Sequence, residues 1–156
     1  MRTKLIASAV LSLAVILAFI GTVQATGDRG RTIEVLSRPT AISNFVDLGD
    51  PGPTPGDMLV FVEELFSRAH PSEKVGELEG RCTLINPATE RFECTAVSTF
   101  ARGTIATQGI LINVQGAVSV GGVTGGTGKY RGARGEIRIQ LGPAEGPHEI
   151  RFILHP

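Results

Sequence analysis

The stretch GGVTGGTGKYRGARGE at residues 121–136 decides the fold, because it is too rich in glycine to form a helix. Glycine adopts positive φ at little cost and lets neighbouring backbones approach closely, so we expect Gly125, Gly126 and Gly128 to form a structural corner. Residues 133–141 then alternate: apolar or small side chains share one face, and arginine, glutamate and glutamine share the other. A period of two predicts a half-buried strand that starts at the glycine corner.

The same stretch does not fit the common phosphate-binding loops. Counting back from Gly128 and Lys129 puts Val123 where a P-loop has its first glycine, and Tyr130 where it has a serine or threonine for magnesium. The dinucleotide-binding pattern fails as well, because Arg131 occupies its last glycine position. Both motifs also require a helix after the loop, whereas a strand is expected here. The glycines therefore predict a turn in a β protein rather than a nucleotide site.

Similar alternation, separated by turn residues, recurs along the chain and predicts eight short strands. Inward-facing glycines at 76, 80 and 135 favour a closed barrel over a sandwich, because strongly coiled strands need small residues at crowded positions. We therefore expect an all-β fold, an eight-stranded antiparallel β-barrel, with residues 44–56 as an ordered loop at its mouth. The expected strands are 32–37, 57–66, 75–85, 92–100, 104–112, 116–120, 133–141 and 148–155.

The chain has two cysteines, Cys82 and Cys94, in a segment that reads as strand, turn, strand. Asn86 and Pro87 open the turn, and a hairpin centred on Ala88 places the two cysteines opposite each other. A disulfide closing so short a loop would stabilise the fold by about 3 kcal/mol in the chain-entropy model. The alternative is a pair of free thiols, one of them catalytic.

The N-terminus has the pattern of an export signal. Arg2 and Lys4 precede an apolar run at 5–20, and small residues up to Ala25 fit a cleavage site. We predict a signal peptide at 1–25 and a secreted, extracellular single domain at 26–156; an uncleaved anchor is the alternative. That domain carries 13 basic and 15 acidic residues, a formal charge of −2, so we expect neither nucleic-acid binding nor, after cleavage, a membrane partner.

Several segments together resemble the allene oxide cyclase and dirigent protein superfamily. They are GGTGKYRGARGE at 125–136, GDMLVF at 56–61, Val75-Gly76 with Gly80 and Cys82, Phe92-Glu93 leading to Ser98 and Phe100, and Gln108-Gly109. The resemblance covers residues 32–142. It implies a calycin-like barrel, a homodimer or homotrimer, and a hydrophobic pocket at one mouth. Such a pocket would hold a small hydrophobic molecule and steer its cyclisation or coupling by positioning it.

The resemblance also suggests acidic site residues. The cyclases keep a carboxylate on the first strand, and Glu34 lies beside the matching position, Val35; dirigent proteins carry acidic residues near that strand's end, where this chain has Asp47 and Asp50. We take Glu34 and Asp50 as candidate catalytic residues. Phe61, Phe92, Ser98 and Phe100 are candidate ligand-binding residues on inward strand faces.

We expect no metal or other cofactor, because His70, His148 and His155 lie in predicted loops or near the terminus without a second ligand at metal spacing. Three functions stay open: a steering enzyme, a non-catalytic carrier of a hydrophobic ligand, and a structural barrel filled by its own side chains. An ionisable group buried in an open pocket would favour the enzyme.

Overall fold

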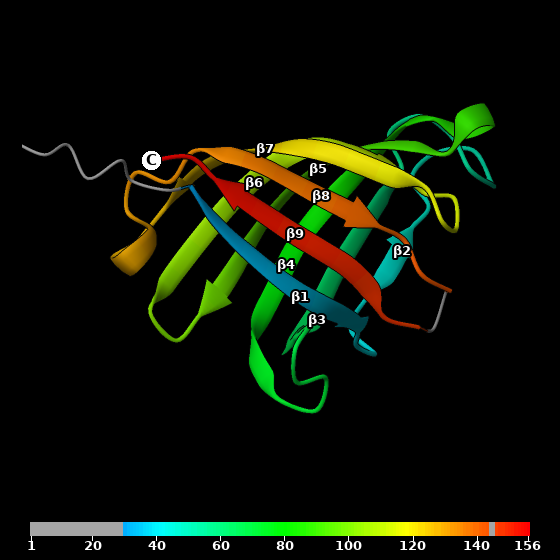
Figure 1. Cartoon of the computed structure of the whole chain (residues 1–156). Coiled ribbons are helices and arrows are strands. Elements are labelled where there is room, and N and C mark those ends of the chain that lie inside the picture. The colour runs from blue at the N-terminus through cyan, green and yellow to red at the C-terminus, as the bar shows by residue number, and fades with distance from the viewer. Residues whose placement is uncertain (1–29, 144–145) are drawn as a thin grey trace, which may run out of the picture.

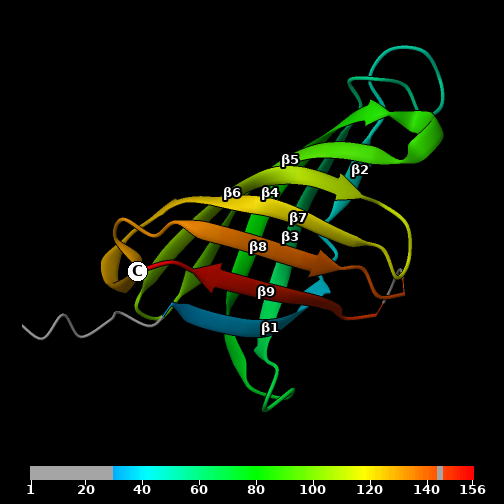
Figure 2. The same cartoon turned by 45° about the horizontal axis from the view of Figure 1, so that its top comes forward.

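The computed structural model describes residues 30–143 and 146–156 and shows a closed eight-stranded antiparallel barrel, as predicted (Figures 1 and 2). The predicted signal peptide lies outside the described residues. The strands follow the order β1-β9-β8-β7-β6-β5-β4-β3, and β1 closes the barrel by pairing with both β9 and β3. The barrel strands are β1 (Arg31–Pro39), β3 (Met58–Ser67), β4 (Lys74–Asn86), β5 (Arg91–Phe100), β6 (Gly103–Ile112), β7 (Val118–Gly126), β8 (Gly135–Gln140) and β9 (His148–Leu154).

Two elements differ from the sequence-based expectation. The segment predicted as a loop contains a short strand, β2 (Asn44–Val46), which pairs with the beginning of β3. The strand predicted to stop at residue 120 continues to Gly126 as β7. Its glycines lie in the strand because β6 and β7 approach closely there: a Cβ at Gly109 would come within 2.6 Å of the Gly121 Cα. The turn itself is the short 3-10 helix η2 (Gly128–Tyr130), where Gly128 has a φ of +57°.

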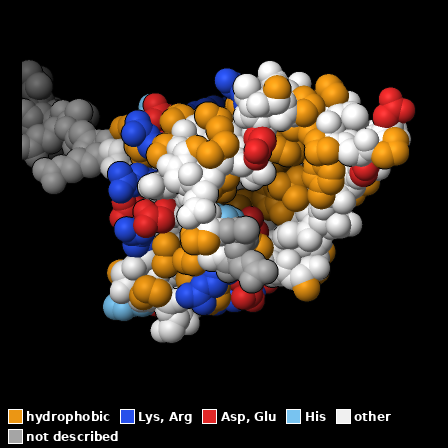
Figure 3. All heavy atoms as spheres, turned by 90° about the vertical axis from the view of Figure 1, so that its right-hand side faces the viewer, with side chains coloured by type: hydrophobic (Ala, Val, Ile, Leu, Met, Phe, Trp, Pro, Cys, Tyr) orange, Lys and Arg blue, Asp and Glu red, His pale blue; other side chains and the backbone are white. Residues whose placement is uncertain are grey.

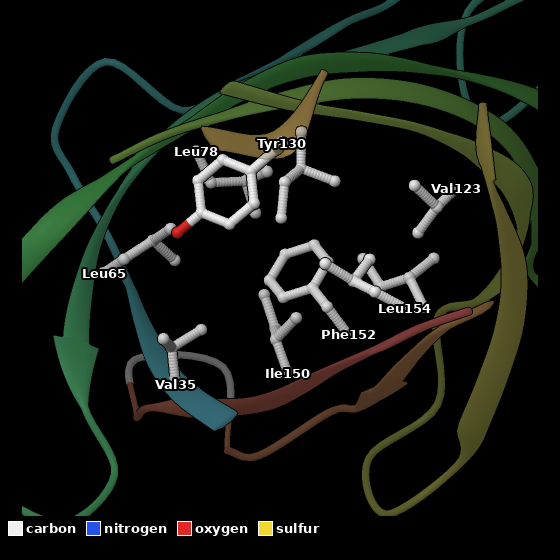
Figure 4. Close-up of a cluster of buried hydrophobic side chains, with 10 residues drawn as sticks. Val35, Leu65, Leu78, Val123, Tyr130, Ile150, Phe152 and Leu154 are labelled. Atoms are coloured by element: carbon white, nitrogen blue, oxygen red, sulfur yellow. The ribbon is translucent and has the colours of Figure 1, made fainter. Parts of the chain in front are cut away.

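One half of the barrel is filled by hydrophobic side chains (Figure 4). Phe152 is completely buried at its centre, and Phe100 packs edge-on against Phe152 with a ring-centroid distance of 6.0 Å. The ring of Tyr130, from η2, also packs against Phe100, with a centroid distance of 5.6 Å. We call this half the filled end; it lies toward η2 and the C-terminus. The remaining buried members of the cluster are Val35, Leu65, Leu78, Ile105, Val123, Ile137, Ile150 and Leu154.

The expected disulfide joins Cys82 of β4 to Cys94 of β5. The two residues are direct partners in the β4–β5 register, with their Cα atoms 4.0 Å apart. Together with Leu84 and Phe92, Cys82 forms a second, smaller hydrophobic cluster nearer the other end of the barrel. The short 3-10 helix η1 (Pro87–Thr89) turns the chain between β4 and β5, and the Asn86 side chain accepts a hydrogen bond from the Thr89 N–H.

A fully buried carboxylate holds the loop before β3. Asp57 accepts hydrogen bonds from the backbone N–H groups of Leu48, at 2.8 Å, and Thr54, at 2.6 Å. These bonds lower the pKa of Asp57 below its ordinary value, so the carboxylate form is favoured. Asp47 adds a second anchor by accepting a hydrogen bond of 3.0 Å from the Gly52 N–H, so two carboxylates order this loop with its prolines and glycines. Among the described residues, we find no helix long and apolar enough to cross a membrane.

Gly125 and Gly126, predicted to form the corner with Gly128, lie instead at the end of β7, where they give a matched pair of variants. A Cβ at Gly126 would lie 2.4 Å from the Tyr130 carbonyl oxygen and 2.6 Å from that of Thr104, whereas a Cβ at Gly125 would meet nothing closer than 4.0 Å. We expect Gly126→Ala to lower the free energy of unfolding by about 1–3 kcal/mol, the usual cost of overpacking. Gly125→Ala should be neutral or slightly stabilising. Urea unfolding of both variants tests this, and equal stabilities would contradict it.

Reduction of the disulfide should lower the free energy of unfolding by about 3 kcal/mol, because the unfolded chain regains the entropy of the closed loop. Chemical unfolding of the natural chain with and without a thiol reductant measures the difference. A double variant, Cys82→Ser with Cys94→Ser, is the control and should not respond to the reductant. Two alkylatable thiols in the purified protein would contradict the bridge.

Candidate functional site

The half of the barrel away from the filled end encloses a cavity of about 130 Å³ that opens at the mouth (Figure 3). Seen from this side, hydrophobic side chains line the hollow. Leu78, Ile137 and Ile150 belong both to the filled core and to the cavity wall, so the core forms the inner boundary of the cavity. The other apolar lining residues include Leu59, Phe61, Ala96, Leu111, Ile139 and Leu141, and both cysteines of the disulfide.

Three polar side chains face this cavity from neighbouring strands: Ser37 of β1, Glu63 of β3 and His148 of β9. Ser37 is the register partner of His148 across β1 and β9. On its other side Ser37 pairs with Leu65, and Glu63 is two residues from Leu65 on the same face of β3. Barrel closure through β1 therefore places the hydroxyl, the carboxyl and the imidazole on one wall. We call these three residues the polar wall.

Burial raises the pKa of the Glu63 carboxyl above its ordinary value, because the charged form loses water. The Ser37 hydroxyl and the nearby His148 act in the opposite direction and favour the carboxylate. The two effects together make Glu63 a carboxyl that can exchange a proton inside a mostly apolar cavity. Carboxyls shifted in this way are typical of acid–base sites.

His148 is held in one tautomer by the backbone. The N–H of Gly142 donates a hydrogen bond of 3.1 Å to Nδ1 of the imidazole. Since Nδ1 accepts, the neutral ring carries its proton on Nε2. The sequence placed His148 near a loop and gave it no role; the structure places it at the start of β9, against the cavity.

The candidate catalytic residues from the sequence lie away from the cavity lining. Glu34 is on the outer face of β1, where its carboxylate forms an ion pair with the guanidinium of Arg151 on β9, with 2.6 Å between the nearest nitrogen and oxygen. Asp50 is exposed in the loop before β3. The structure does not bring these two carboxylates together with each other or with the polar wall.

The candidate ligand-binding residues are divided between different parts of the barrel. Phe61 lines the cavity, and Phe92 packs in the cluster around the disulfide. Phe100 belongs to the filled end, beside Tyr130. Ser98 is completely buried on β5 but does not line the cavity.

Glu63 was missed at the sequence level, although a signal for it is present. Residues 57, 59, 61, 63 and 65 share one face of the predicted strand 57–66, so after Asp57 at its start, Glu63 is the one charged residue of that face. A carboxylate between apolar residues in the middle of a strand face predicts either a functional group or a paired charge. Within residues 30–143 and 146–156, no group of three histidine, cysteine or acidic side chains is placed to hold a metal ion.

Comparison with known proteins supports the fold and leaves the reaction open. No protein-family model matches the chain, and no curated protein matches it in sequence. Among solved structures, a pyocyanin demethylase is similar with 25% identity and a TM-score of 0.70, over 80% of this chain and 99% of that one. A pterocarpan synthase dirigent protein has 15% identity and a TM-score of 0.62, over 80% and 82% of the two chains. An exo-specific intermolecular Diels-Alderase has 18% identity and a TM-score of 0.65, over 81% and 98%.

These similarities confirm the fold expected from the sequence motifs: a small antiparallel barrel like those of a dirigent protein and a Diels-Alderase. The similar structures carry out different reactions, as their names state. The fold alone therefore does not identify the chemistry, which depends on the cavity and its polar wall.

The pKa of Glu63 leads to a prediction on stability. Because its pKa is raised in the folded protein, ionisation of Glu63 removes stability as pH rises from the ordinary glutamate value toward the folded-state value. Glu63→Gln should therefore unfold at higher urea concentration than the natural chain at about pH 8, with little difference at about pH 4. Glu64→Gln, which alters the neighbouring outer carboxylate that pairs with Lys74, is the matched control and should not gain stability. A Glu63→Gln variant less stable than the natural chain at both pH values would contradict the prediction.

Proposed function

We propose that this barrel binds a small hydrophobic molecule in its cavity and steers the cyclisation or coupling of that molecule, with Glu63 acting on the reacting part. The observation that carries the proposal is the partly buried carboxyl of raised pKa in a cavity that is otherwise mostly apolar. A carrier needs only an apolar lining. Keeping an ionisable group in such a lining costs stability, and this cost is typical of catalytic sites.

The size of the cavity limits what enters it. A volume of about 130 Å³ is close to that of an engineered apolar cavity of about 150 Å³ that admits benzene. One ring of a ligand therefore fits inside, and the rest of a larger molecule would lie in the mouth. Enclosing the ring on several sides restricts its conformation, which is the main requirement for steering a reactive molecule.

Glu63 would transfer the proton in the reaction. A carboxyl with a raised pKa can protonate a developing alkoxide or enolate and can accept the proton back in a later step. A pterocarpan synthase dirigent protein and a Diels-Alderase have similar barrels. This similarity supports ring formation as the reaction class and does not identify the substrate.

Two further properties are part of the proposal. We propose that residues 1–25 direct export and that the barrel acts outside the cell. We also propose a homodimer or homotrimer. Val118 and Val120 on the outer face of β7 are both 52% exposed, and such apolar residues on a strand are suited to a subunit contact.

Ligand binding can be tested with toluene, whose ring matches the cavity. We expect toluene to shift the NMR signals of Leu111 and Ile139 at the mouth and to leave those of the filled end unchanged. Ala96→Leu extends a side chain into the cavity and should weaken toluene binding at least about tenfold, since its added methylenes occupy the ring's space. Ala106→Leu is the matched control. Ala106 lies between the buried residues Ile105 and Thr107, so its side chain points out of the barrel, and this variant should bind toluene normally. No shift at the mouth in the natural chain would contradict the proposal.

The reaction itself is tested with an unsaturated epoxide that cyclises slowly in water to a racemic product. The proposal expects an excess of one enantiomer in the presence of the protein, and loss of this excess in Glu63→Gln while toluene binding is retained. If the product stays racemic although toluene binds, the protein is a carrier and the steering function is wrong.

A further inference from the structure

The filled end of the barrel carries an excess of positive charge on its outer surface. Four parts of the chain meet there: the start of β1, the turn between β5 and β6, the η2 corner and the C-terminus (Figures 1 and 2). They comprise residues 30–33, 100–104, 126–135 and 153–156, which contain five basic residues and no aspartate or glutamate. The five exposed basic residues are Arg31, Arg102, Lys129, Arg131 and Arg134. The formal charge of the whole domain, −2, therefore does not describe this end.

Backbone and ring contacts hold three of these cations close together. The Lys129 N–H donates a hydrogen bond of 2.8 Å to the Arg102 carbonyl, which joins η2 to the turn between β5 and β6. The guanidinium carbon of Arg31 lies 5.4 Å from the ring centroid of Tyr130, the residue after Lys129. The neighbouring charges of Arg102 and Arg31 lower the pKa of Lys129 below its ordinary value. We call Arg31, Arg102 and Lys129 the basic cluster.

The basic cluster differs from most other cations of the barrel in having no counter-charge. Among residues 30–143 and 146–156, none of its three members forms an ion pair with a carboxylate. The ion pairs found there are Arg68 with Glu149, Lys74 with Glu64 and Glu77, Arg138 with Glu136, and Arg151 with Glu34. Like charges held close together repel one another, and an anion placed against them offsets that repulsion. The cluster is therefore suited to an anionic partner.

The connection of the chain indicates which anionic partner can reach this end. β1 begins at Arg31, and the predicted apolar run ends at residue 20, so ten residues join the two. Ten residues span at most about 35 Å when fully extended. An apolar run held in a membrane, during export or as an anchor, therefore keeps the filled end near the lipid headgroups. The cavity lies in the opposite half of the barrel.

We propose that the filled end docks on an anionic membrane surface, where Arg31, Arg102 and Lys129 bind the phosphate groups of the lipids. The barrel then stands with its mouth toward the solution, so a ligand can enter the cavity without passing through the lipid. The net charge predicted no membrane partner after cleavage. Charges farther away than the Debye length of about 8 Å are largely screened, so the charge at one end decides whether that end binds lipid. This inference does not depend on the cavity or on its ligand.

Binding of the full chain to vesicles tests the proposal. The measured quantity is the partition coefficient on vesicles of equal parts phosphatidylglycerol and phosphatidylcholine, divided by that on pure phosphatidylcholine. A double variant, Arg102→Gln with Lys129→Gln, should lower this ratio at least about tenfold, because each basic residue near an anionic surface strengthens binding about fivefold. Binding through the apolar run is common to both kinds of vesicle and cancels in the ratio.

A matched control removes the same charge elsewhere. Arg81 and Arg91 are exposed on β4 and at the beginning of β5, outside the four segments of the filled end. The double variant Arg81→Gln with Arg91→Gln should leave the ratio unchanged within about twofold. Salt is a second readout: an increase from about 0.1 M to 1 M shortens the Debye length from about 10 Å to 3 Å and should abolish the preference for anionic vesicles.

Each outcome supports or overturns the docking surface. Equal binding of the natural chain to both kinds of vesicle overturns it, as does an equal loss in the two double variants. If the basic cluster binds dextran sulfate but not the vesicles, the partner is an acidic polysaccharide and the membrane assignment is wrong. Circular dichroism checks that each variant is folded. Should the first double variant fail to fold, Lys129→Gln alone must lower the ratio about fivefold, while Lys129→Arg retains it. Toluene binding in the cavity is unaffected in every case, so the proposed function is tested separately.

Discussion

β1 is the strand that turns an open sheet into a barrel, since it pairs with β9 from Arg31 to Ser37 and with β3 from Val35 to Pro39. Closure satisfies the backbone groups of what would otherwise be two sheet edges. It also brings together three strands that are distant in sequence. The position where β1 contacts both neighbours is the position of the polar wall, so the same backbone pairing that completes the fold assembles the site.

The barrel interior has a packed end that stabilises the fold and an open end that holds the cavity. The aromatic rings of Phe100, Tyr130 and Phe152 pack against one another at one end of the barrel. Toward the mouth, Ala96 and Gly109 stand among larger lining residues such as Leu59, Phe61 and Leu111, and the barrel encloses a cavity there. A chain of this size can leave part of its interior unfilled because the filled end and the disulfide stabilise the rest.

Glycine has two separate roles in this barrel. Between β6 and β7, Gly109 and Gly121 let two strands approach more closely than any side chain would permit. At the corner, Gly128 takes a left-handed φ, and at the start of β8 Gly135 has a φ of +141° with no room for a Cβ. The sequence motif that resembles the cyclase and dirigent barrels is therefore a set of steric requirements of the barrel, which explains why it indicates the fold and does not indicate the reaction.

The sequence by itself predicted the eight barrel strands and their inward faces and favoured the Cys82–Cys94 bridge, because alternation with period two and turn chemistry are local properties. The prediction from sequence ended β7 too early and missed β2, because both depend on backbone pairing with a neighbouring strand. Only the tertiary structure decided that Ser37, Glu63 and His148 share one wall. Side-chain alternation tells which face a residue occupies, but which strands become neighbours, and how far their side chains fill the space between them, is set by barrel closure over long sequence separations.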